Sequence, residues 1–258
     1  DPRGERLTCD ADAGFVEWMS ACGGSLAVST YQAGKLFLVG WNGRQVSFLA
    51  RNFDRPMGLD VQGPRMALVT THAIQVFANA PNLAPLYLER GRYDALYLPR
   101  ALYVMPDLAV HDLAYAGDTL WVVNTQCSCI ATLSLDQTFV SHWQPPFIDS
   151  LAAEDRCHLN GMAMVEGRPA YVTMLSQTNT RGGWREHKKD GGIVMDMAGG
   201  EVLLRGLAMP FIPLGLVSLL LLLEPLLLEL LLLPPPPPPA SSLCPPTTPK
   251  CLLRPIPL

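Results

Sequence analysis

The sequence predicts an all-β protein: a β-propeller fragment of about four blades, followed by a low-complexity tail rich in Leu and Pro. Three observations support this prediction. Short alternating apolar runs are separated by turn residues, a local pattern recurs about every 50 residues, and the composition changes abruptly near residue 210. No stretch of residues 26–80 sustains the 3.6-residue apolar period of an amphipathic helix.

The first half of the chain contains the clearest strand and turn signals. Strands are predicted at residues 26–31, 35–41 and 45–53, with Asn42-Gly43 between the last two. Asn-Gly is a strong hairpin signal because a type I′ turn needs positive φ at both central residues. Further strands are predicted at 58–61, 66–71, 74–77, 86–88 and 102–105. A basic and aromatic loop with Arg90, Arg92 and Tyr93 joins the last two.

The second half continues the pattern and shows a repeat. Strands are predicted at residues 113–115, 120–124, 130–135, 139–143, 161–165, 170–175, 192–197 and 202–204. Four similar starts read MGLD (57–60), HDLA (111–114), NGMA (160–163) and RGLA (205–208). Their spacing is typical of a four-stranded propeller blade, which must stack on its neighbours to bury both faces of its sheet. The alternative is a β-sandwich with accidental repetition.

Charge and cysteine content exclude some classes of protein. The net charge of −4 gives no electrostatic basis for nucleic-acid binding. The one basic cluster, at residues 181–189, is interrupted by Glu186, as expected of a solvated loop. Seven cysteines are too few for a disulfide-built scaffold, and the number is odd, so reduced thiols in a cytoplasmic protein are expected.

The blade pattern stops at Pro210, which divides the chain into a propeller-like domain, 1–209, and a non-globular tail, 210–258. Our hypothesis is that the tail is not the native continuation, because pattern and composition collapse at one point. Residues 211–233 are long enough to span a bilayer but contain Glu224, Pro225 and Glu229. Membrane attachment through this segment is therefore expected only if the tail is native.

The central stretch carries a family resemblance. The segments LWVVNT (120–125), DRCHLNG (155–161) and GGWRE (182–186), together with HDLA, resemble a family of uncharacterised bacterial proteins known as TIGR03032 or DUF4915. The likeness runs from about residue 25 to residue 209. The resemblance implies a six-bladed β-propeller of the NHL, strictosidine-synthase or gluconolactonase kind, with no established reaction to transfer. The chain departs from that pattern after GLAMP (206–210), so closure as a six-bladed ring is not expected.

Candidate binding residues cluster at the repeat starts. Loops at one end of a propeller axis converge, so polar residues of different repeats meet there. The candidates are His111 and Asp112 in one repeat and His158 and Asn160 in the next, with Asn124 at a strand end. Except for Asn124, these residues are also candidate ligands of a divalent metal, with oxygen ligands favouring Ca²⁺ or Mg²⁺ and imidazole favouring a transition metal. The alternative is that the histidines are structural and hydrogen-bond blade to blade.

Two loops supply the remaining candidates. Arg156, in the run Glu154-Asp155-Arg156, would belong to an acid/base set or an anion clamp, or would anchor the loop through salt bridges. Residues 178–189 would form a lid that places Trp184, Arg185 and Glu186 over a ligand. The alternative is an exposed loop with the indole packed against a blade.

No complete catalytic constellation is visible. Cys127-x-Cys129 has no second pair to complete a zinc site, and Cys157 would point away from His158 because neighbours on a strand face opposite sides. GxSxG, HExxH, P-loop and GxGxxG motifs are absent. The favoured function is therefore a module that binds a small molecule, peptide or protein. The alternative is a metal-dependent enzyme of the lactonase or hydrolase kind with its site at the propeller axis.

Overall fold

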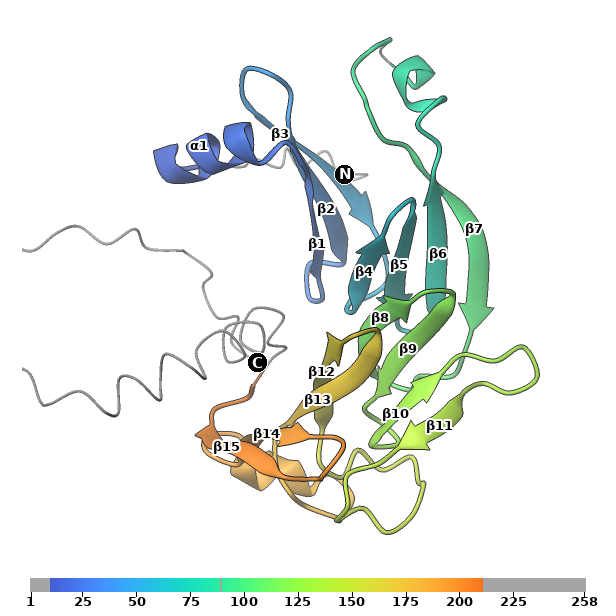
Figure 1. Ribbon diagram of the computed structural model, residues 1–258, viewed down its shortest axis with the longest axis vertical. Helices are drawn as coiled ribbons and strands as arrows, with labels where there is room; N and C mark the ends of the chain where they lie inside the picture. The colour runs from blue at the N-terminus through green and yellow to red at the C-terminus, as the bar shows by residue number, and fades with distance from the viewer. Residues whose placement is uncertain (1–9, 89, 211–258) are drawn as a thin grey trace, which may run out of the picture.

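The computed structural model describes residues 10–88 and 90–210, which form four antiparallel β-sheets arranged around one axis (Figure 1). The first sheet contains β1 (Leu26–Thr30), β2 (Lys35–Trp41) and β3 (Val46–Asn52), and the second contains β4 (Leu59–Gln62), β5 (Arg65–Thr70), β6 (Ala73–Asn79) and β7 (Tyr97–Val104). The third contains β8 (Val110–Ala116), β9 (Thr119–Asn124), β10 (Cys129–Thr132) and β11 (Val140–Trp143). The fourth contains β12 (Leu159–Val165), β13 (Arg168–Met174), β14 (Gly192–Asp196) and β15 (Val202–Leu207). The predicted all-β propeller arrangement of four blades is confirmed.

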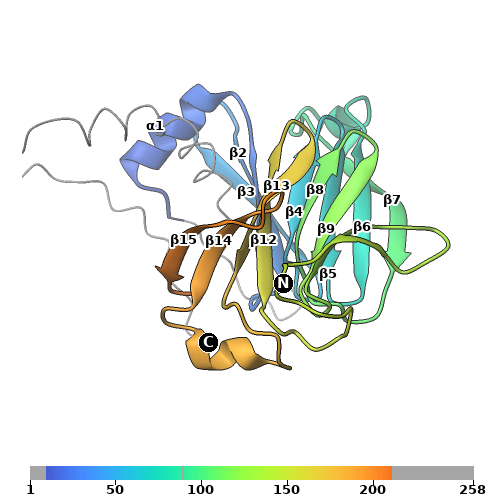
Figure 2. The same ribbon diagram turned by 60° about the horizontal axis from the view of Figure 1, so that its bottom comes forward.

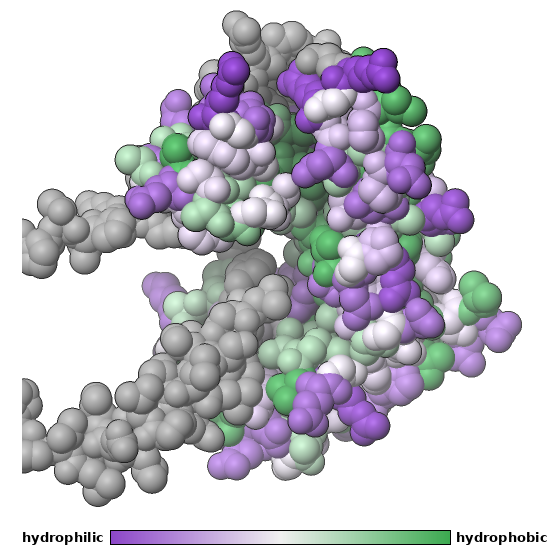
Figure 3. Space-filling view, turned by 45° about the horizontal axis from the view of Figure 1, so that its top comes forward, coloured by the Kyte–Doolittle hydropathy of each residue, from purple (hydrophilic) through white to green (hydrophobic). Residues whose placement is uncertain are grey.

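In each four-stranded blade the strands pair in chain order, starting from an innermost strand. The innermost strands are β4, β8 and β12, and they lie side by side at the axis (Figures 1 and 2). The term "start face" denotes the end of the propeller at which these inner strands begin. The outer surface mixes polar and apolar residues, as on most folded proteins (Figure 3).

Adjacent blades are held together by apolar clusters between their sheets. The first and second sheets pack through Leu36, Met66 and Leu68, and the other two junctions contain similar clusters. Carboxylates add links near the axis: Asp60 Oδ2 accepts a hydrogen bond from Tyr115 N at 2.7 Å, and Asp112 Oδ2 accepts one from Met162 N at 3.0 Å. These bonds join inner strands that share no backbone ladder.

The second and third blades approach closely at Gly58. A Cβ atom at this position would lie 2.9 Å from the Asp112 Cα atom, closer than real Cβ contacts. Only a residue without a side chain fits there, because the neighbouring atoms belong to the backbone.

The first sheet lacks an innermost strand within the described residues. Ser29 Oγ in β1 donates to Met57 O, at the start of the next blade, at 2.5 Å. Thr125, directly after β9, makes a similar contact with Leu159 O of the following blade, also at 2.5 Å. The sequence LAVST of β1 also resembles MALVT (66–70), which ends β5. By this equivalence β1 takes the position of a second strand, and no strand in residues 10–88 or 90–210 pairs with its free edge.

The structure departs from the sequence prediction at three places. Residues 86–88 do not form a strand: Ala84–Leu86 is a short 3₁₀ helix, in which Pro85 has no N–H to give to a ladder. Helix α1 (Ala13–Cys22) was not expected. Asp12 caps it by accepting a hydrogen bond from Phe15 N at 2.7 Å, and Gly23 ends it with φ 62°.

The third departure concerns the repeat register. Arg205-Gly206-Leu207 lies on β15, the last strand of the fourth blade, and does not start a blade. The three true starts share a left-handed residue two positions upstream: Arg55, Ala109 and His158 have φ of 46°, 46° and 51°. Met209 has the same conformation, with φ 44°. In the three true blades the start follows such a left-handed residue, whereas RGLA precedes it.

No helix in the part of the chain that the structure describes is long and apolar enough to cross a membrane. The segment 211–233, considered above for membrane attachment, lies outside the described residues.

Candidate functional site

The two histidines predicted from the repeat meet at the start face. His111 lies on β8, and His158 immediately precedes β12. Their rings pack edge to face, with centroids 4.7 Å apart and planes at 88°. The contact exists because the left-handed backbone of His158 turns the chain into the inner strand next to that of His111.

The protonation of His111 follows from its hydrogen bonds. Asn160 Nδ2 donates to Pro210 O at 2.7 Å, so Asn160 Oδ1 is left to accept from His111 Nδ1 at 2.7 Å. The proton of the neutral ring is therefore on Nδ1, and Nε2 is an acceptor. Burial, and next the charge of His158, lower the pKa of His111 from 6.5 to about 4, so the ring is neutral at neutral pH.

His158 is fixed by a carboxylate and an indole. Its Nδ1 lies 2.9 and 3.0 Å from the two oxygens of Asp155, and Trp184 Nε1 donates to Asp155 Oδ2 at 2.8 Å. The Trp184 ring stacks on the His158 ring with centroids 4.1 Å apart. Asp155 and His158 both have left-handed backbones, with φ of 47° and 51°. Such strain in residues other than glycine persists only where the surroundings hold it, and it is common at functional sites.

Two cations lie over the indole. The residues that follow Gly182 form a 3₁₀ helix, Gly183–His187, which buries Trp184 against the blade. The Arg185 guanidinium carbon lies 4.6 Å from the Trp184 ring centroid, and Lys188 Nζ lies 5.2 Å from it. Arg185 Nη2 is also 3.9 Å from Asp155 Oδ2. Asp155 thus connects His158, Trp184 and Arg185. The loop that contains the 3₁₀ helix places the Trp184 indole on the His158 ring.

Two predicted site residues serve the blades themselves. Asp112 accepts from Leu113 N at 2.9 Å and Met162 N at 3.0 Å, and burial raises its pKa from 3.8 to about 7. Asn124 Oδ1 accepts from Cys127 N at 3.0 Å, which closes the turn before β10. Its Nδ2 is buried without a hydrogen-bond partner among the described residues.

Arg156 and Glu186 do not join the histidines. Arg156 binds Glu154 Oε2 at 2.8 Å, Asp149 Oδ1 at 2.6 Å and Asn179 Oδ1 at 2.8 Å. This is the geometry of a loop anchor. Glu186 is exposed and has no hydrogen bond or ion pair with any described residue.

The metal-binding hypothesis is not tested by the structure. Among the described residues no three His, Cys, Asp or Glu side chains are placed to hold a metal ion together. Of the predicted ligands, His111, His158 and Asn160 lie together, whereas Asp112 joins two inner strands. The Nε2 atoms of both imidazoles have no hydrogen-bond partner among the described residues, so they are the atoms that remain to bind a metal or another ligand.

Asp155 is a site residue that the sequence pattern does not predict. It lies in the run Glu154-Asp155-Arg156, of which only Arg156 is a candidate binding residue on sequence grounds. The spacing Asp155-x-x-His158 was the available signal, because a tight turn brings residues three apart into contact. Cys157, in contrast, is buried, and burial raises its pKa to about 12, so its thiol is inert at neutral pH.

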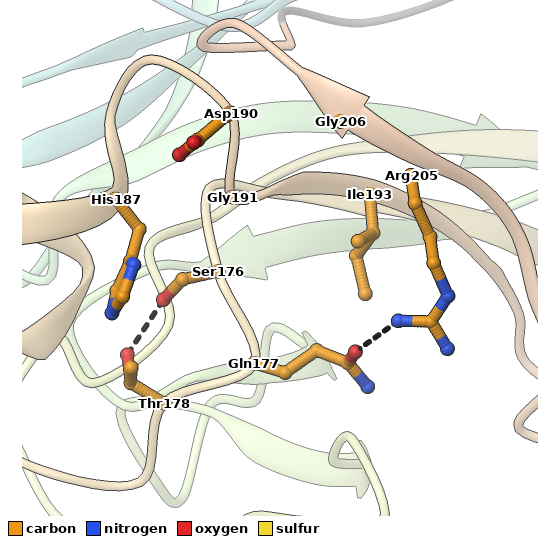
Figure 4. A pocket seen from close by; sticks show the side chains of 9 residues that line it. All are labelled: Ser176, Gln177, Thr178, His187, Asp190, Gly191, Ile193, Arg205 and Gly206. Atoms are coloured by element: carbon orange, nitrogen blue, oxygen red, sulfur yellow. Dashed lines mark hydrogen bonds between the residues drawn. The ribbon is translucent and has the colours of Figure 1, made fainter.

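Two cavities open near this cluster. The larger, of about 350 Å³, lies beside the end of β13 (Figure 4). Within it the Ser176 and Thr178 hydroxyls are 2.6 Å apart, and Arg205 donates to Gln177 Oε1 at 2.6 Å. The smaller, of about 100 Å³, is lined by His111 and by residues of the first two sheets.

Distant likenesses among solved structures include the following two. A protein from Bacteroides uniformis described as a "putative 6-phosphogluconolactonase" has 11% identity and a TM-score of 0.33, over 70% of this chain and 55% of that one. AztD of Citrobacter koseri has 10% identity and a TM-score of 0.28, over 73% and 47%. The chain therefore spans about half of each of these proteins.

No curated protein sequence matches the chain. The model of one protein family matches residues 13–224, which is most of the chain and extends past Pro210. The chain therefore belongs to the family described as a domain of unknown function, DUF4915.

Proposed function

We propose that this β-propeller is a binding module that recognises a small molecule or a short peptide at its start face. The observation that carries the proposal is the contact between His111 and His158, which come from neighbouring blades with rings 4.7 Å apart. Each ring is oriented through its Nδ1 atom, His111 by Asn160 and His158 by Asp155. Two imidazoles fixed in this way present their Nε2 atoms in a set geometry, and such preorganisation favours binding.

The surrounding groups indicate what kind of ligand fits. Neutral His111 offers an acceptor, and the exposed Arg185 guanidinium offers a bidentate donor, whereas the buried Trp184 ring holds His158 in place. A few polar groups held in fixed orientations are typical of sites that recognise polar small molecules and peptide segments. We therefore expect a ligand that carries both a hydrogen-bond donor and an anionic or carbonyl group.

A thermal-shift screen of polar metabolites and short peptides on the full chain tests this function. Compounds that raise the Tm are then titrated against His158→Asn and Arg185→Gln. The matched control is Arg168→Gln, which changes an exposed arginine at the opposite end of an inner hairpin. We expect Kd to rise at least about tenfold in the two site variants, the equivalent of about 1.4 kcal/mol, and to stay unchanged in the control. Ligands that bind all four proteins equally would place binding elsewhere.

A second candidate function, hydrolysis, rests on the Asp155–His158 pair. A carboxylate on Nδ1 holds an imidazole with Nε2 available as a general base, the arrangement used in hydrolytic triads. In this reaction His158 Nε2 accepts a proton from water as the water oxygen attacks an ester or lactone carbonyl. Arg185 would stabilise the resulting oxyanion.

Hydrolysis is tested with a panel of esters and lactones. General-base catalysis typically contributes about 10²–10⁴-fold, so His158→Gln should reduce kcat/KM by at least about 10²-fold. Metal analysis of the same preparation by plasma mass spectrometry tests the metal-dependent version, with His111→Ala as the variant expected to lose the ion. Turnover no faster than the buffer background would remove this candidate.

A further inference from the structure

The smaller cavity lies where three consecutive sheets meet at the start face. Its walls include Tyr31 after β1, Arg55 and Met57 before β4, Thr71 after β5, and Asp107 and His111 around the start of β8. Of these residues only His111 belongs to the surface proposed above for ligand binding. The cavity is therefore a separate site that shares one wall with that surface.

One polar group in this wall lacks a partner. Thr71 Oγ1 is buried and makes no hydrogen bond to any described residue. A buried hydroxyl without a partner costs about 1–3 kcal/mol, so such a group points to a ligand or an ordered water. The cavity of about 100 Å³ holds either a few waters or one small polar molecule.

Two opposite charges flank the cavity without being paired to each other. The Arg55 guanidinium carbon lies 5.9 Å from the Tyr31 ring centroid, and Arg55 forms no ion pair within the described residues. Asp107 Oδ1 accepts from Ala109 N at 3.1 Å, which leaves its other oxygen uncommitted among those residues. Both residues are exposed to solvent and neither is engaged in an ion pair with a described residue, so each is able to bind an opposite charge.

We propose that this cavity binds a small zwitterion, a molecule that carries an ammonium and a carboxylate group. The carboxylate binds the Arg55 guanidinium, whose planar fork suits two parallel hydrogen bonds, and it accepts a further one from Thr71 Oγ1. The ammonium donates to Asp107 and to the acceptor nitrogen of His111. This assignment gives a partner to each polar group described above and introduces no unpaired charge.

Isothermal titration calorimetry of the full chain with glycine, alanine, β-alanine and 4-aminobutyrate tests the proposal. Acetate and methylammonium serve as the two halves of the ligand. We expect saturable binding of at least one zwitterion, with Kd at least about tenfold lower than for either half. Binding of acetate alone with the same Kd as the zwitterion would show a simple anion site. The absence of binding heat from every zwitterion would show that the cavity holds only water. Either result overturns the proposal.

Variants locate the site. Arg55→Gln and Asp107→Asn should each raise the Kd of the zwitterion at least about tenfold, and Thr71→Val should raise it less. Arg51→Gln is the matched control. It changes an arginine on β3 of the first sheet and should leave the Kd of the zwitterion unchanged. If binding is unaltered in Arg55→Gln, the site assignment is wrong. His158→Asn and Arg185→Gln should leave zwitterion binding intact, so this site and the proposed ligand surface can fail independently.

Discussion

The first sheet and the three complete blades differ at the axis. The first sheet keeps the second, third and fourth strands of a blade and packs on its neighbour through Leu36 much as the complete blades pack on theirs. The complete blades add an inner strand each, and these strands carry Asp60, Asp112 and His111. Inner and outer strands both contribute to the apolar junctions, as Leu113 of β8 and Met162 of β12 show. What the inner strands add is the carboxylate links between blades and His111 of the candidate site.

The largest expected effect concerns the pH dependence that Asp112 gives to the inner strands. Its pKa is higher in the folded protein, about 7, than the ordinary 3.8, so the folded state binds this proton more tightly. The contribution to stability is complete below about pH 4 and is lost as pH rises through about 7, on the order of 4 kcal/mol in all. In Asp112→Asn the free energy of unfolding, measured by urea denaturation from pH 4 to pH 8, should no longer show this decline. An unchanged slope would mean that another group carries it.

His111 should act in the opposite direction. Its pKa falls from 6.5 to about 4 on folding, so the unfolded chain binds this proton more tightly. The corresponding stability is complete above about pH 6.5 and is lost as pH falls through about 4, on the order of 3 kcal/mol. In His111→Gln this loss should disappear from denaturation curves measured between pH 7 and pH 4. Persistence of the acid-side loss in the variant would contradict the assignment.

Adding one methyl group tests the close approach of the inner strands. Gly58→Ala forces a Cβ atom against the Asp112 backbone, and we expect the free energy of unfolding to fall by about 2 kcal/mol. Gly40→Ala in β2 of the first sheet is the comparison, since its Cβ would meet the Ser25 side chain, which can move. Equal losses in the two variants, measured by chemical denaturation, would show that the axis is no tighter than the first sheet.

The smallest effect compares the two hydroxyl links between blades. Ser29→Ala removes the bond from β1 to Met57 O, and Thr125→Val removes the bond to Leu159 O. Each should cost about 1 kcal/mol, with the larger loss at Thr125 because that hydroxyl is buried. If Ser29→Ala has no effect in the same denaturation assay while Thr125→Val does, β1 does not take the role of a second strand.

The strands were predictable because alternation and Asn-Gly or Gly-Pro turns have a local physical cause. Helix α1 was not, because Met19 is its only fully buried residue and no apolar stripe marks it. The blade register was misjudged at residues 205–208 because the left-handed marker falls on Arg55, Ala109, His158 and Met209, none of which is glycine. Side chains that usually avoid this conformation give no turn signal.

For the candidate site, the repeat alone indicated that His111, His158 and Asn160 would meet. It did not distinguish them from Asp112, whose carboxylate accepts a hydrogen bond from Met162 N of the next inner strand, because a shared position in the repeat does not show which partner a side chain has. The role of Asp155 was not predictable from the sequence either, since it depends on the loop that brings Trp184 into hydrogen-bonding contact with Asp155. The boundary between a propeller domain and a tail at residue 210 stays a prediction, and the family match extends past it to residue 224.

The carboxylate links at the axis also bear on how such proteins change in length during evolution. The Asp60 bond and the Asp112 bond each join one blade to the next, and each blade brings its own acceptor or donor. Duplication of one repeat in the gene would copy a complete junction with it. Deletion of one would not restore the same junction, because the two carboxylates stand at different repeat positions: Asp60 aligns with Ala114, and Asp112 aligns with Gly58. Gain of a blade by duplication therefore carries a carboxylate link with it, whereas loss of a blade brings together two neighbours that were not selected to fit each other.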